Sequence, residues 1–460
     1  MDTEATNWAR TEFKHARLGD ARRSERLIKL AAQRGGQPNA SIPQSCGSKA
    51  AAKAAYRFYG NDAIVNSRAL DSHKQATKER AASEKVVLAV QDTTELDYTN
   101  HPAMKGTGYL RRPDDHGLLL HDTMLVTKDR VPLGIINRQL WARPLEEFGK
   151  HRQRKQLLTS EKESQVWLTS LLATAELQKQ LPDTRLVNVG DRDADIYDLF
   201  LLAEDLHQDL LVRACRDRRV DHPEQYLWPH LESRPVAGTI TVTVPRKEKQ
   251  PSRQASLTVR YGQVTLRPPR DRQSEHLKCI TIWAVLVQEE NPPAGVEPIS
   301  WLLLTTVRVD SFEDACERVA WYACRWVIEM YHKVLKSGCR VEERQFDDTK
   351  PLERYLVIDS VIAWRVLYMT MLGREVPDMP CTAILEAHEW QALYCFIKQT
   401  NRPPAEPPSL REVTLWIAQL GGYIGREKDG PPGTIVMWRG LQRLHDVAAA
   451  WLIFRCPNPP

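Results

Sequence analysis

Two kinds of apolar pattern divide the 460-residue chain. In the first 60 residues, apolar positions follow helical spacing. Asp20 is placed to cap a helix over about 21–33, and Ser48 is placed to cap a second helix that Gly60 ends. Further along, short continuous apolar runs of the kind found in buried strands replace this spacing. The pattern therefore predicts short helices followed by a sheet.

Strands and helices alternate in the middle of the chain. The predicted strands read KVVLAVQD, which ends on Asp92, then LLLHDTMLVT (118–127), VPLGIINRQLWAR (131–143), TRLVNVGD, which ends on Asp191, and DLLVRAC. Helices are predicted in TSEKESQVWLTSLLATAELQKQ and ADIYDLFLLAEDL. Three strands, a helix and then strand–helix–strand is the order of a mixed α/β sheet.

Residues 216–300 show a different pattern of apolar and polar positions. The segments GTITVTVPR, ASLTVRYGQVTLRPP and LKCITIWAVLVQEE alternate apolar and polar residues, which predicts an antiparallel β insertion of about 85 residues. SWLLLTTV (300–307) is expected to return to the main sheet. Ser311 with Asp314 has the spacing of a capping box and opens a long helix.

The chain is predicted to be helical after about residue 345. The apolar run ERYLVIDSVIAWRVLYMTMLG is the basis of this prediction. A Pro-rich linker follows at 401–408, and two amphipathic helices are expected in 409–455. We therefore expect three domains, at 1–65, 66–370 and 371–460.

Composition is ordinary for a soluble globular protein, with 42% hydrophobic and 27% charged residues. No apolar run approaches the roughly 18 residues that cross a membrane, and the N-terminus lacks the apolar stretch of a secretory signal. Nine cysteines show no CxxC pair, which is typical of reduced thiols in a cytoplasm. We expect a cytoplasmic protein.

Positive charge is concentrated in the N-terminal segment. Residues 1–60 hold eleven Lys and Arg against five acids, a net charge of +6, whereas the whole chain carries only +5. Such a basic segment favours binding of a polyanion, although a solvated helical surface has the same composition. Two basic stripes on short helices suit contact with a phosphate backbone.

Two acids follow predicted buried strands. A carboxylate such as Asp92 or Asp191, held rigidly at a sheet edge, can bind a hard cation such as Mg²⁺. Each aspartate alone is also common turn chemistry. Asp193, Asp195 and His121 we interpret as helix-capping or structural residues.

The stretch YACRWVIEMYHKVLKSG (322–338) supplies a third acid. On one continuous helical wheel, Tyr322, Arg325, Glu329 and Lys336 fall within roughly 60° of one another. The opposite arc, with Cys324, Val327, Ile328, Tyr331, Val334 and Leu335, is a core face. A plain exposed helix with a Glu329–Lys333 pair would show the same pattern.

Three carboxylates can hold two divalent ions about 4 Å apart, an arrangement used for in-line displacement at phosphodiesters. Arg and Lys beside the acid are unneeded for binding cations, but they suit a site where phosphates must dock next to metal ions.

The spacing Tyr322-x2-Arg325-x3-Glu329-x6-Lys336 resembles the Tyr–Arg–Glu–Lys signature of one branch of the DDE insertion-sequence transposases. The resemblance covers most of the chain. LGDARRSERL and AAYRFYGN resemble that branch's DNA-binding segment, VQDTTELDY and GDRDADI resemble its two Asp blocks, and WLLLTT resembles the strand before the signature helix. The C-terminal tail resembles the family's dimerisation helices only through IAQLGGYI and scattered Trp and Leu positions.

The resemblance implies an RNase H-like, retroviral-integrase-type catalytic core. Asp92, Asp191 and Glu329 would be catalytic ligands of two Mg²⁺ or Mn²⁺ ions per site. The implied activity is cut-and-paste transposition, with nicking at the terminal repeats, hairpin formation and opening, and strand transfer to target DNA. The implied partners are double-stranded DNA and a second copy of the chain in a synaptic complex.

DNA contacts are implied for several basic and aromatic residues. Tyr322, Arg325 and Lys336 would contact phosphates of the element end, with Lys333 beside them. Trp301 would stack on a base flipped out during hairpin formation, and Arg213 would be a further phosphate contact. The residues that match the end-recognition region are Arg22, Arg23, Arg26 and Arg57.

Two alternatives remain open from the sequence. One is a metal-dependent DNA nuclease of the same fold without strand transfer. The other is a DNA-binding repressor or non-catalytic remnant, although such a protein has no physical need for three carboxylates beside phosphate-binding Arg and Lys.

Overall fold

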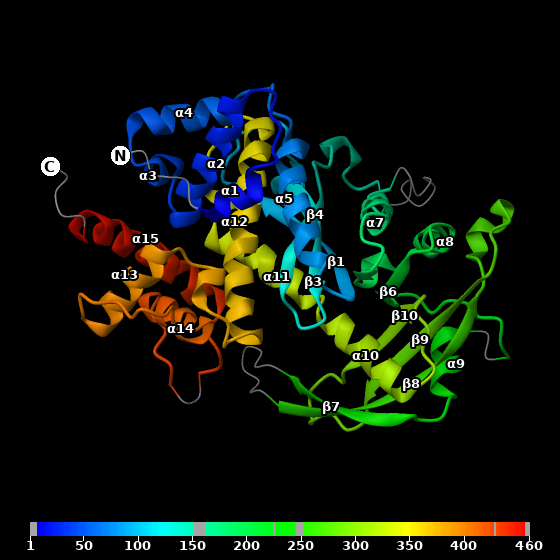
Figure 1. The fold of residues 1–460 in the computed structure, drawn as a ribbon. Coiled ribbons are helices and arrows are strands. Elements are labelled where there is room, and N and C mark those ends of the chain that lie inside the picture. Colours follow the sequence, from blue (N-terminus) through cyan, green and yellow to red (C-terminus); the bar gives the residue numbers. More distant parts are fainter. Residues whose placement is uncertain (1–6, 151–161, 224–225, 245–252, 427–428, 456–460) are drawn as a thin grey trace. The chain divides into compact units, whose positions relative to one another are not determined.

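The computed structural model describes residues 7–150, 162–223, 226–244, 253–426 and 429–455, and Figure 1 shows its elements. The chain forms two compact units. Unit 1 comprises Met1–Ser83, Thr93–Lys150 and Val327–Pro460, and unit 2 comprises Glu84–Asp92 and His151–Trp326.

Unit 2 contains a mixed sheet in the order β1-β5-β6-β10-β9-β8-β7. Its strands are β1 (Val86–Asp97, of which 86–92 belong to this unit), β5 (Arg185–Gly190), β6 (Asp209–Arg213), β7 (Gly238–Val244), β8 (Arg253–Leu266), β9 (Ile280–Glu289) and β10 (Ser300–Thr305). β1, β5 and β6 run parallel, and all later neighbours pair antiparallel. The expected mixed α/β sheet is confirmed.

The β insertion is antiparallel, as predicted, but it does not form a separate sheet. β9 pairs with β10, and β10 pairs with β6, so the insertion extends the sheet that begins with β1. Within the predicted segments, residues 159–161, 224–225 and 245–252 lie outside the described residues.

Helices cover the sheet of unit 2. They are α7 (Gln165–Gln178), α8 (Tyr197–Asp205), α9 (Leu227–Glu232) and α10 (Phe312–Ala323), with 3-10 turns at Arg192–Ala194 and Arg270–Glu275. Residues of α7, α8 and α9 form one apolar core with the strands β6, β8, β9 and β10. Ser311 caps α10 through the predicted capping box with Asp314.

Unit 1 has helical N-terminal and C-terminal regions. Its helices are α1 (Asn7–Phe13), α2 (Ala21–Gly36), α3 (Ile42–Cys46), α4 (Lys49–Tyr59), α5 (Asn66–Ala81), α11 (Trp326–Lys333, whose first residue belongs to unit 2), α12 (Thr349–Glu375), α13 (Ala387–Lys398), α14 (Leu410–Leu420) and α15 (Thr434–Arg455). Shorter turns occur at Leu145–Glu147, Val334–Gly338, Val341–Glu343 and Cys381–Ala383. The sequence patterns did not predict α5, and they predicted helical regions around α1, α3 and α13 without giving these helices their own bounds.

The strands of unit 1 surround β3. β3 (His116–Thr127) lies next to β1 and pairs antiparallel with β2 (Gly108–Tyr109) and with β4 (Pro132–Trp141). A turn at 128–130 joins β3 to β4, and Arg130 adopts a left-handed conformation there.

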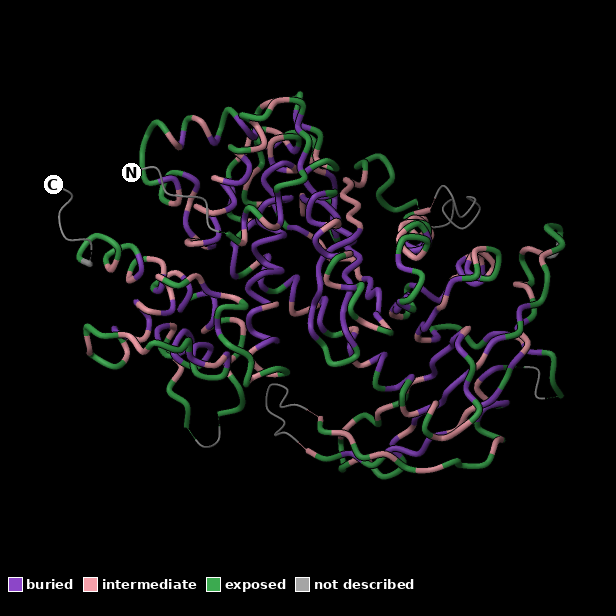
Figure 2. The backbone as a smooth tube through the Cα atoms, viewed as in Figure 1, coloured by how far each residue is buried: buried purple, intermediate pink, exposed green. Residues whose placement is uncertain are grey.

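The helix α12 forms the core of unit 1. By length and composition it is apolar enough to cross a membrane, which the sequence analysis did not predict. In the protein, however, 83% of its 18-residue apolar window is buried (Figure 2). Its Asp359 is fully buried and accepts hydrogen bonds from Arg34 of α2, including one of 2.8 Å. α12 is therefore the core helix against which the N-terminal helices pack.

Candidate active site

Asp92 and Asp191 lie on neighbouring parallel strands. The pairing of β1 with β5 ends at Val90↔Val189, and each aspartate follows its strand's last paired residue by two positions. Because adjacent strands lie about 4.8 Å apart, the two carboxylates start from the same edge of the sheet.

One boundary differs from the prediction. β1 does not end at Asp92 but continues to Asp97, next to β3. Only the pairing with β5 ends before Asp92, and that is enough to place its carboxylate at the carboxyl edge of β5.

The backbone after β5 fixes Asp191. Its carboxylate caps the 3-10 turn Arg192–Ala194 by accepting the N–H of Asp193 at 2.8 Å. Gly190 packs so closely that a Cβ there would collide with the side chain of Ala194. Burial and the charge of Asp191 together raise the pKa of Asp193. Asp195 instead accepts hydrogen bonds from Arg218 and two backbone N–H groups, which confirms its structural role.

Arg325 and Tyr322 come from the end of α10 and the residues after it. The Nη1 of Arg325 lies 3.8 Å from Oδ2 of Asp92. The ring of Tyr322 meets that of Trp301 edge-on, with centroids 5.6 Å apart, and only 6% of Tyr322 is exposed. Burial raises the pKa of Tyr322 although the charges of Arg325 and Arg213 oppose that shift. The Tyr322 hydroxyl therefore stays protonated at neutral pH.

Arg213 lies one strand further along the sheet. β6 pairs with β5 up to Gly190↔Val212, so Arg213 follows next to Asp191. Its Nη2 donates to the carbonyl of Ser300 at 3.0 Å. Burial lowers the pKa of Arg213, although the Tyr322 hydroxyl beside it acts in the opposite direction.

Unit 2 thus brings six of the predicted site residues into one neighbourhood. They come from the middle of β1, the ends of β5 and β6, the start of β10, and the end of α10 with the residues after it: Asp92, Asp191, Arg213, Trp301, Tyr322 and Arg325.

The signature stretch is not one continuous helix, so the single wheel predicted for it is wrong. α10 ends at Ala323, α11 begins at Trp326, and the segment Val334–Gly338 widens into a π-helix. The predicted core side is buried as expected. Tyr322, however, is buried rather than displayed on an open face.

Glu329, Lys333 and Lys336 belong to unit 1. Glu329 is partly buried in α11 and Lys333 is exposed. Lys336 Nζ lies 3.5 Å from Oε1 of Glu342, which also accepts the N–H of Asp97 at 2.9 Å.

A buried ion pair that the sequence reading missed anchors α11. Arg138 of β4 binds Asp122 of β3 with bonds of 2.8 and 3.0 Å and donates to the Tyr331 hydroxyl at 2.7 Å. Both charged residues are largely buried. An aspartate inside the apolar run LLLHDTML was the available signal, because a buried carboxylate needs a partner. His121, beside it, bonds the Thr93 hydroxyl at 2.8 Å, in keeping with the structural role expected of it.

Trp326 is a second residue that the sequence reading left out. It follows Arg325 directly, and 60% of it is exposed. An exposed indole beside an arginine that faces a candidate catalytic acid suits stacking on a nucleic-acid base.

The donor chemistry of the aspartate pair fits a hard cation. Both side chains offer carboxylate oxygens, the ligands that Mg²⁺ prefers. Among the described residues, no group of three or more His, Cys, Asp and Glu side chains is arranged so that it could hold a metal ion.

The N-terminal basic residues lie on α2 and α4, whose predicted caps Asp20 and Ser48 are confirmed. Arg22 is paired with Asp20 at 2.9 Å, with 92% of its side chain exposed, and Arg23 donates to the carbonyl of Leu18 at 3.2 Å. Arg26 is partly buried. On α4 the exposed residues are Lys49, Ala50, Lys53, Tyr56 and Arg57.

Two family models match the chain. Residues 5–64 match the model described as transposase DNA-binding, and residues 361–451 match the model described as the transposase Tn5 dimerisation domain. The first range holds α1 to α4, and the second holds α13, α14 and most of α12 and α15. A DNA-binding match and a dimerisation match of this kind near the two ends of one chain support a Tn5-like transposase.

Proposed function

We propose that the chain is a cut-and-paste DNA transposase that binds the terminal repeats of an insertion element, nicks them, forms and opens a hairpin, and joins the ends to target DNA. The observation that carries this proposal is the placement of Asp92 and Asp191 at one edge of neighbouring parallel strands, with Arg325, Tyr322 and Arg213 beside them.

The catalytic core is proposed to be RNase H-like, with Asp92, Asp191 and Glu329 as ligands of two Mg²⁺ or Mn²⁺ ions. Such ions would supply charge stabilisation and activation of the attacking oxygen. The paired aspartates support this part of the proposal, since they place two hard oxygen donors side by side.

The basic and hydroxyl side chains would hold the scissile phosphate. Arg325 can exchange its contact with Asp92 for a phosphate oxygen, and a protonated Tyr322 can donate its O–H. Lys336 would leave Glu342 for a phosphate in the same way, with Lys333 near it. Arg213 would extend this set along the sheet edge.

Four phosphoryl transfers would follow in sequence. Water attacks the phosphorus at the element end and releases a 3′-hydroxyl. That hydroxyl attacks the opposite strand to form a hairpin, water reopens the hairpin, and the 3′-hydroxyl finally attacks target DNA. Trp301 and the exposed Trp326 offer aromatic rings for bases that leave the stack during hairpin formation.

End recognition is proposed for the basic residues of α2 and α4: Arg22, Arg23, Arg26 and Arg57. The match of residues 5–64 to a transposase DNA-binding model supports this. The dimerisation match supports a homodimer that bridges two element ends in a synaptic complex.

A cleavage assay separates this proposal from its alternatives. The protein is incubated with Mg²⁺ and linear DNA that bears the flanking element's terminal repeat, with a scrambled duplex of equal length as the control. Hairpinned ends on the repeat alone support a transposase. Nicking of both duplexes would indicate a nuclease, and binding without any cleavage would indicate a repressor or remnant.

A further inference from the structure

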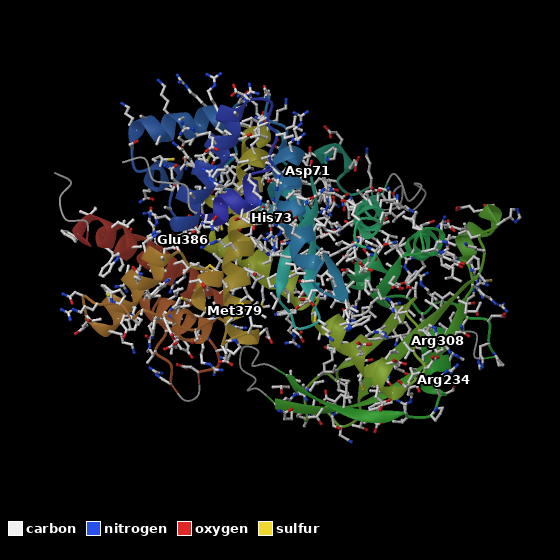
Figure 3. The ribbon with its side chains drawn as sticks, in the orientation of Figure 1. Asp71, His73, Arg234, Arg308, Met379 and Glu386 are labelled. Atoms are coloured by element: carbon white, nitrogen blue, oxygen red, sulfur yellow. The ribbon has the colours of Figure 1, made fainter. Side chains whose placement is uncertain are left out.

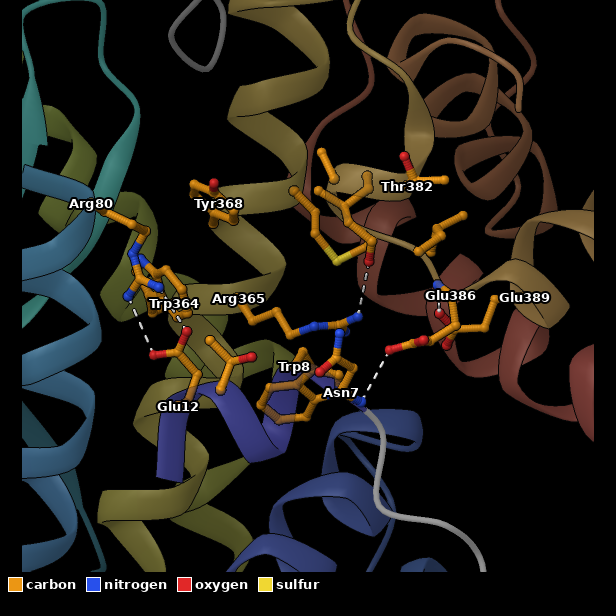
Figure 4. A pocket seen from close by; sticks show the side chains of 15 residues that line it. Asn7, Trp8, Glu12, Arg80, Trp364, Arg365, Tyr368, Thr382, Glu386 and Glu389 are labelled. Atoms are coloured by element: carbon orange, nitrogen blue, oxygen red, sulfur yellow. Dashed lines mark hydrogen bonds and ion pairs between the residues drawn. The ribbon is translucent and has the colours of Figure 1, made fainter. Parts of the chain in front are cut away.

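A cavity of about 230 Å³ lies within unit 1, and none of its lining residues is a candidate active site residue. It is lined by α1, the end of α5, α12 and the segment from Thr382 to Glu389 (Figure 4). Its apolar wall includes Trp8, Tyr368, Met369 and Leu385. The volume is smaller than the roughly 300–1,000 Å³ of pockets for drug-sized ligands, so it suits a small metabolite.

Arg365 lies in this cavity, where Glu389, Glu386 and Glu12 attract its charge from a distance. The residue is 8% exposed, its guanidinium stacks over Trp8 at 4.8 Å, and its hydrogen bond to the carbonyl of Ile384 is long, at 3.4 Å. Across the described residues, it forms no ion pair within 4 Å. A guanidinium has five N–H donors and stays charged in proteins, so a buried one calls for a hydrogen-bond acceptor.

The carboxylates of Glu386 and Glu389 also line the cavity. Oε1 of Glu386 accepts the N–H of Asn7 at 3.0 Å, and Oε2 of Glu389 accepts the N–H of Glu386 at 2.8 Å. Glu386 also accepts the N–H of Glu389 in the capping box that opens α13, whereas Glu389, among the described residues, keeps its second oxygen for another donor. Glu12, by contrast, is already bound to Arg80 and His73. Figure 4 shows Arg365 reaching toward Trp8 with Glu386 and Glu389 nearby.

A simple anion does not fit this lining, because Glu386 and Glu389 would repel it. A simple cation does not fit either, because Arg365 would repel it. A zwitterion satisfies both sides: its carboxylate accepts from Arg365, its ammonium donates to the second oxygen of Glu389 beside the charge of Glu386, and its side chain contacts the apolar wall.

We propose that this cavity is a binding site for a free α-amino acid with an apolar side chain. Since Trp8 lies in the matched DNA-binding range and Arg365 in the matched dimerisation range, the ligand would strengthen the packing between these parts of unit 1. The site is independent of the proposed phosphoryl-transfer chemistry.

Equilibrium dialysis of the full-length chain with radiolabelled L-leucine, L-methionine or L-phenylalanine tests the proposal. We expect saturable binding of at least one of them, near one per chain. The N-acetyl derivative, which lacks the ammonium, and the amide, which lacks the carboxylate, should each compete at least tenfold more weakly.

Variants locate the site. Arg365→Gln should weaken binding at least tenfold and Glu386→Gln severalfold, whereas Lys179→Gln, which removes an exposed charge of unit 2, should leave it unchanged. If Arg365→Gln fails to fold, Glu386→Gln and the two derivatives decide. Absence of saturable binding, equal competition by the blocked derivatives, or undiminished binding by a folded Arg365→Gln would each overturn the proposal.

Discussion

Arg325 is the cation that faces Asp92, at 3.8 Å, and it lies between the buried Tyr322 and the exposed Trp326. A cation in this position stabilises the carboxylate in the free protein and is available to a phosphate once DNA arrives. Its two possible partners make Arg325 a sensitive probe of the site.

We expect Arg325→Gln to lower the rate of strand cleavage by about 100-fold, as is usual when one charge-stabilising donor is lost. Binding of the element end should change little, because most of that affinity comes from other phosphate contacts. Single-turnover cleavage on a gel and anisotropy of a labelled duplex measure the two effects. Arg308→Gln is the control, since Arg308 pairs with Asp310 elsewhere in unit 2 (Figure 3). Equal rates for both variants would contradict a role for Arg325.

Two buried histidines predict how stability depends on pH. Burial lowers the pKa of His121 to about 4, against the attraction of Asp122, and burial also lowers the pKa of His73 (Figure 3). Because the unfolded chain binds protons more readily than the folded one, stability is full above the ordinary histidine pKa of about 6.5 and is lost as pH falls toward 4. Burial raises the pKa of Glu12, but hydrogen bonds and charges from His73 and Arg80 outweigh burial and lower it to about 2. Glu12 therefore loses its contribution to stability only below about pH 4.5.

We therefore expect the Tm to fall between pH 6.5 and pH 4.5, with His121 alone contributing up to about 3 kcal/mol by pH 4. His121→Gln should flatten this slope, since glutamine can still bond the Thr93 hydroxyl but does not titrate. Thermal scans of both proteins at four pH values measure it. A variant with the same slope as the parent protein would show that His121 does not titrate on unfolding.

At the scale of elements, α14 and α15 cross at two glycines. A Cβ on Gly440 would collide with the carbonyl of Ile417, and one on Gly421 would collide with the carbonyl of Val436. Only glycine permits this approach of the two helices in the matched dimerisation range.

Gly440→Ala should therefore lower the free energy of unfolding by about 1–3 kcal/mol, the usual cost of overpacking. It should also weaken dimer formation. Chemical denaturation and light scattering after gel filtration measure these effects. Gly430→Ala is the matched control, because a Cβ there meets nothing within 4 Å. Similar losses in both variants would mean that the helix crossing is not close-packed.

Local signals in the sequence predicted the elements that they control directly. Asp20, Ser48 and the Ser311–Asp314 pair each cap the helix expected of them. The start of α13 was not predicted because Glu386 precedes it in place of the usual Ser, Thr, Asp or Asn, and α5 was missed because it begins after Val65 without a side-chain cap.

The features that the sequence did not predict depend on contacts between residues that lie far apart in the chain. The break of the signature helix after Ala323 has no Pro or Gly to announce it. The buried pair of Arg34 and Asp359 joins residues 325 positions apart. For the candidate site, the sequence predicted the order along the chain of the strands that lead to Asp92 and Asp191. It did not predict the ion pair that anchors α11. The metal ligands and the RNase H-like assignment stay predictions.

For the whole molecule, we expect DNA binding to begin with the exposed basic face of α4. Lys53 and Arg57 lie four residues apart on this face, with Tyr56 between them. Each phosphate that a cation neutralises releases condensed counterions, so the contact is visible in the salt dependence of binding.

Lys53→Ala and Arg57→Ala should each reduce the slope of log affinity against log salt by about 0.9, if each contacts one phosphate. Anisotropy of a terminal-repeat duplex over a range of salt concentrations measures this. Lys179→Ala, in unit 2, should leave the slope unchanged. A slope insensitive to both α4 variants would place the DNA on another surface.

The most direct measurement is the yield of hairpinned element ends with Mg²⁺ for the parent protein, Asp191→Asn, Glu329→Gln and the matched control Asp193→Asn. Asp193 lies two residues beyond Asp191 and contributes its backbone N–H to that carboxylate. We predict that Asp191→Asn and Glu329→Gln bind the ends but form no hairpin, while Asp193→Asn retains most of the parent yield. Hairpins that persist in Asp191→Asn or Glu329→Gln would contradict the assignment of these acids to the DNA-cutting site.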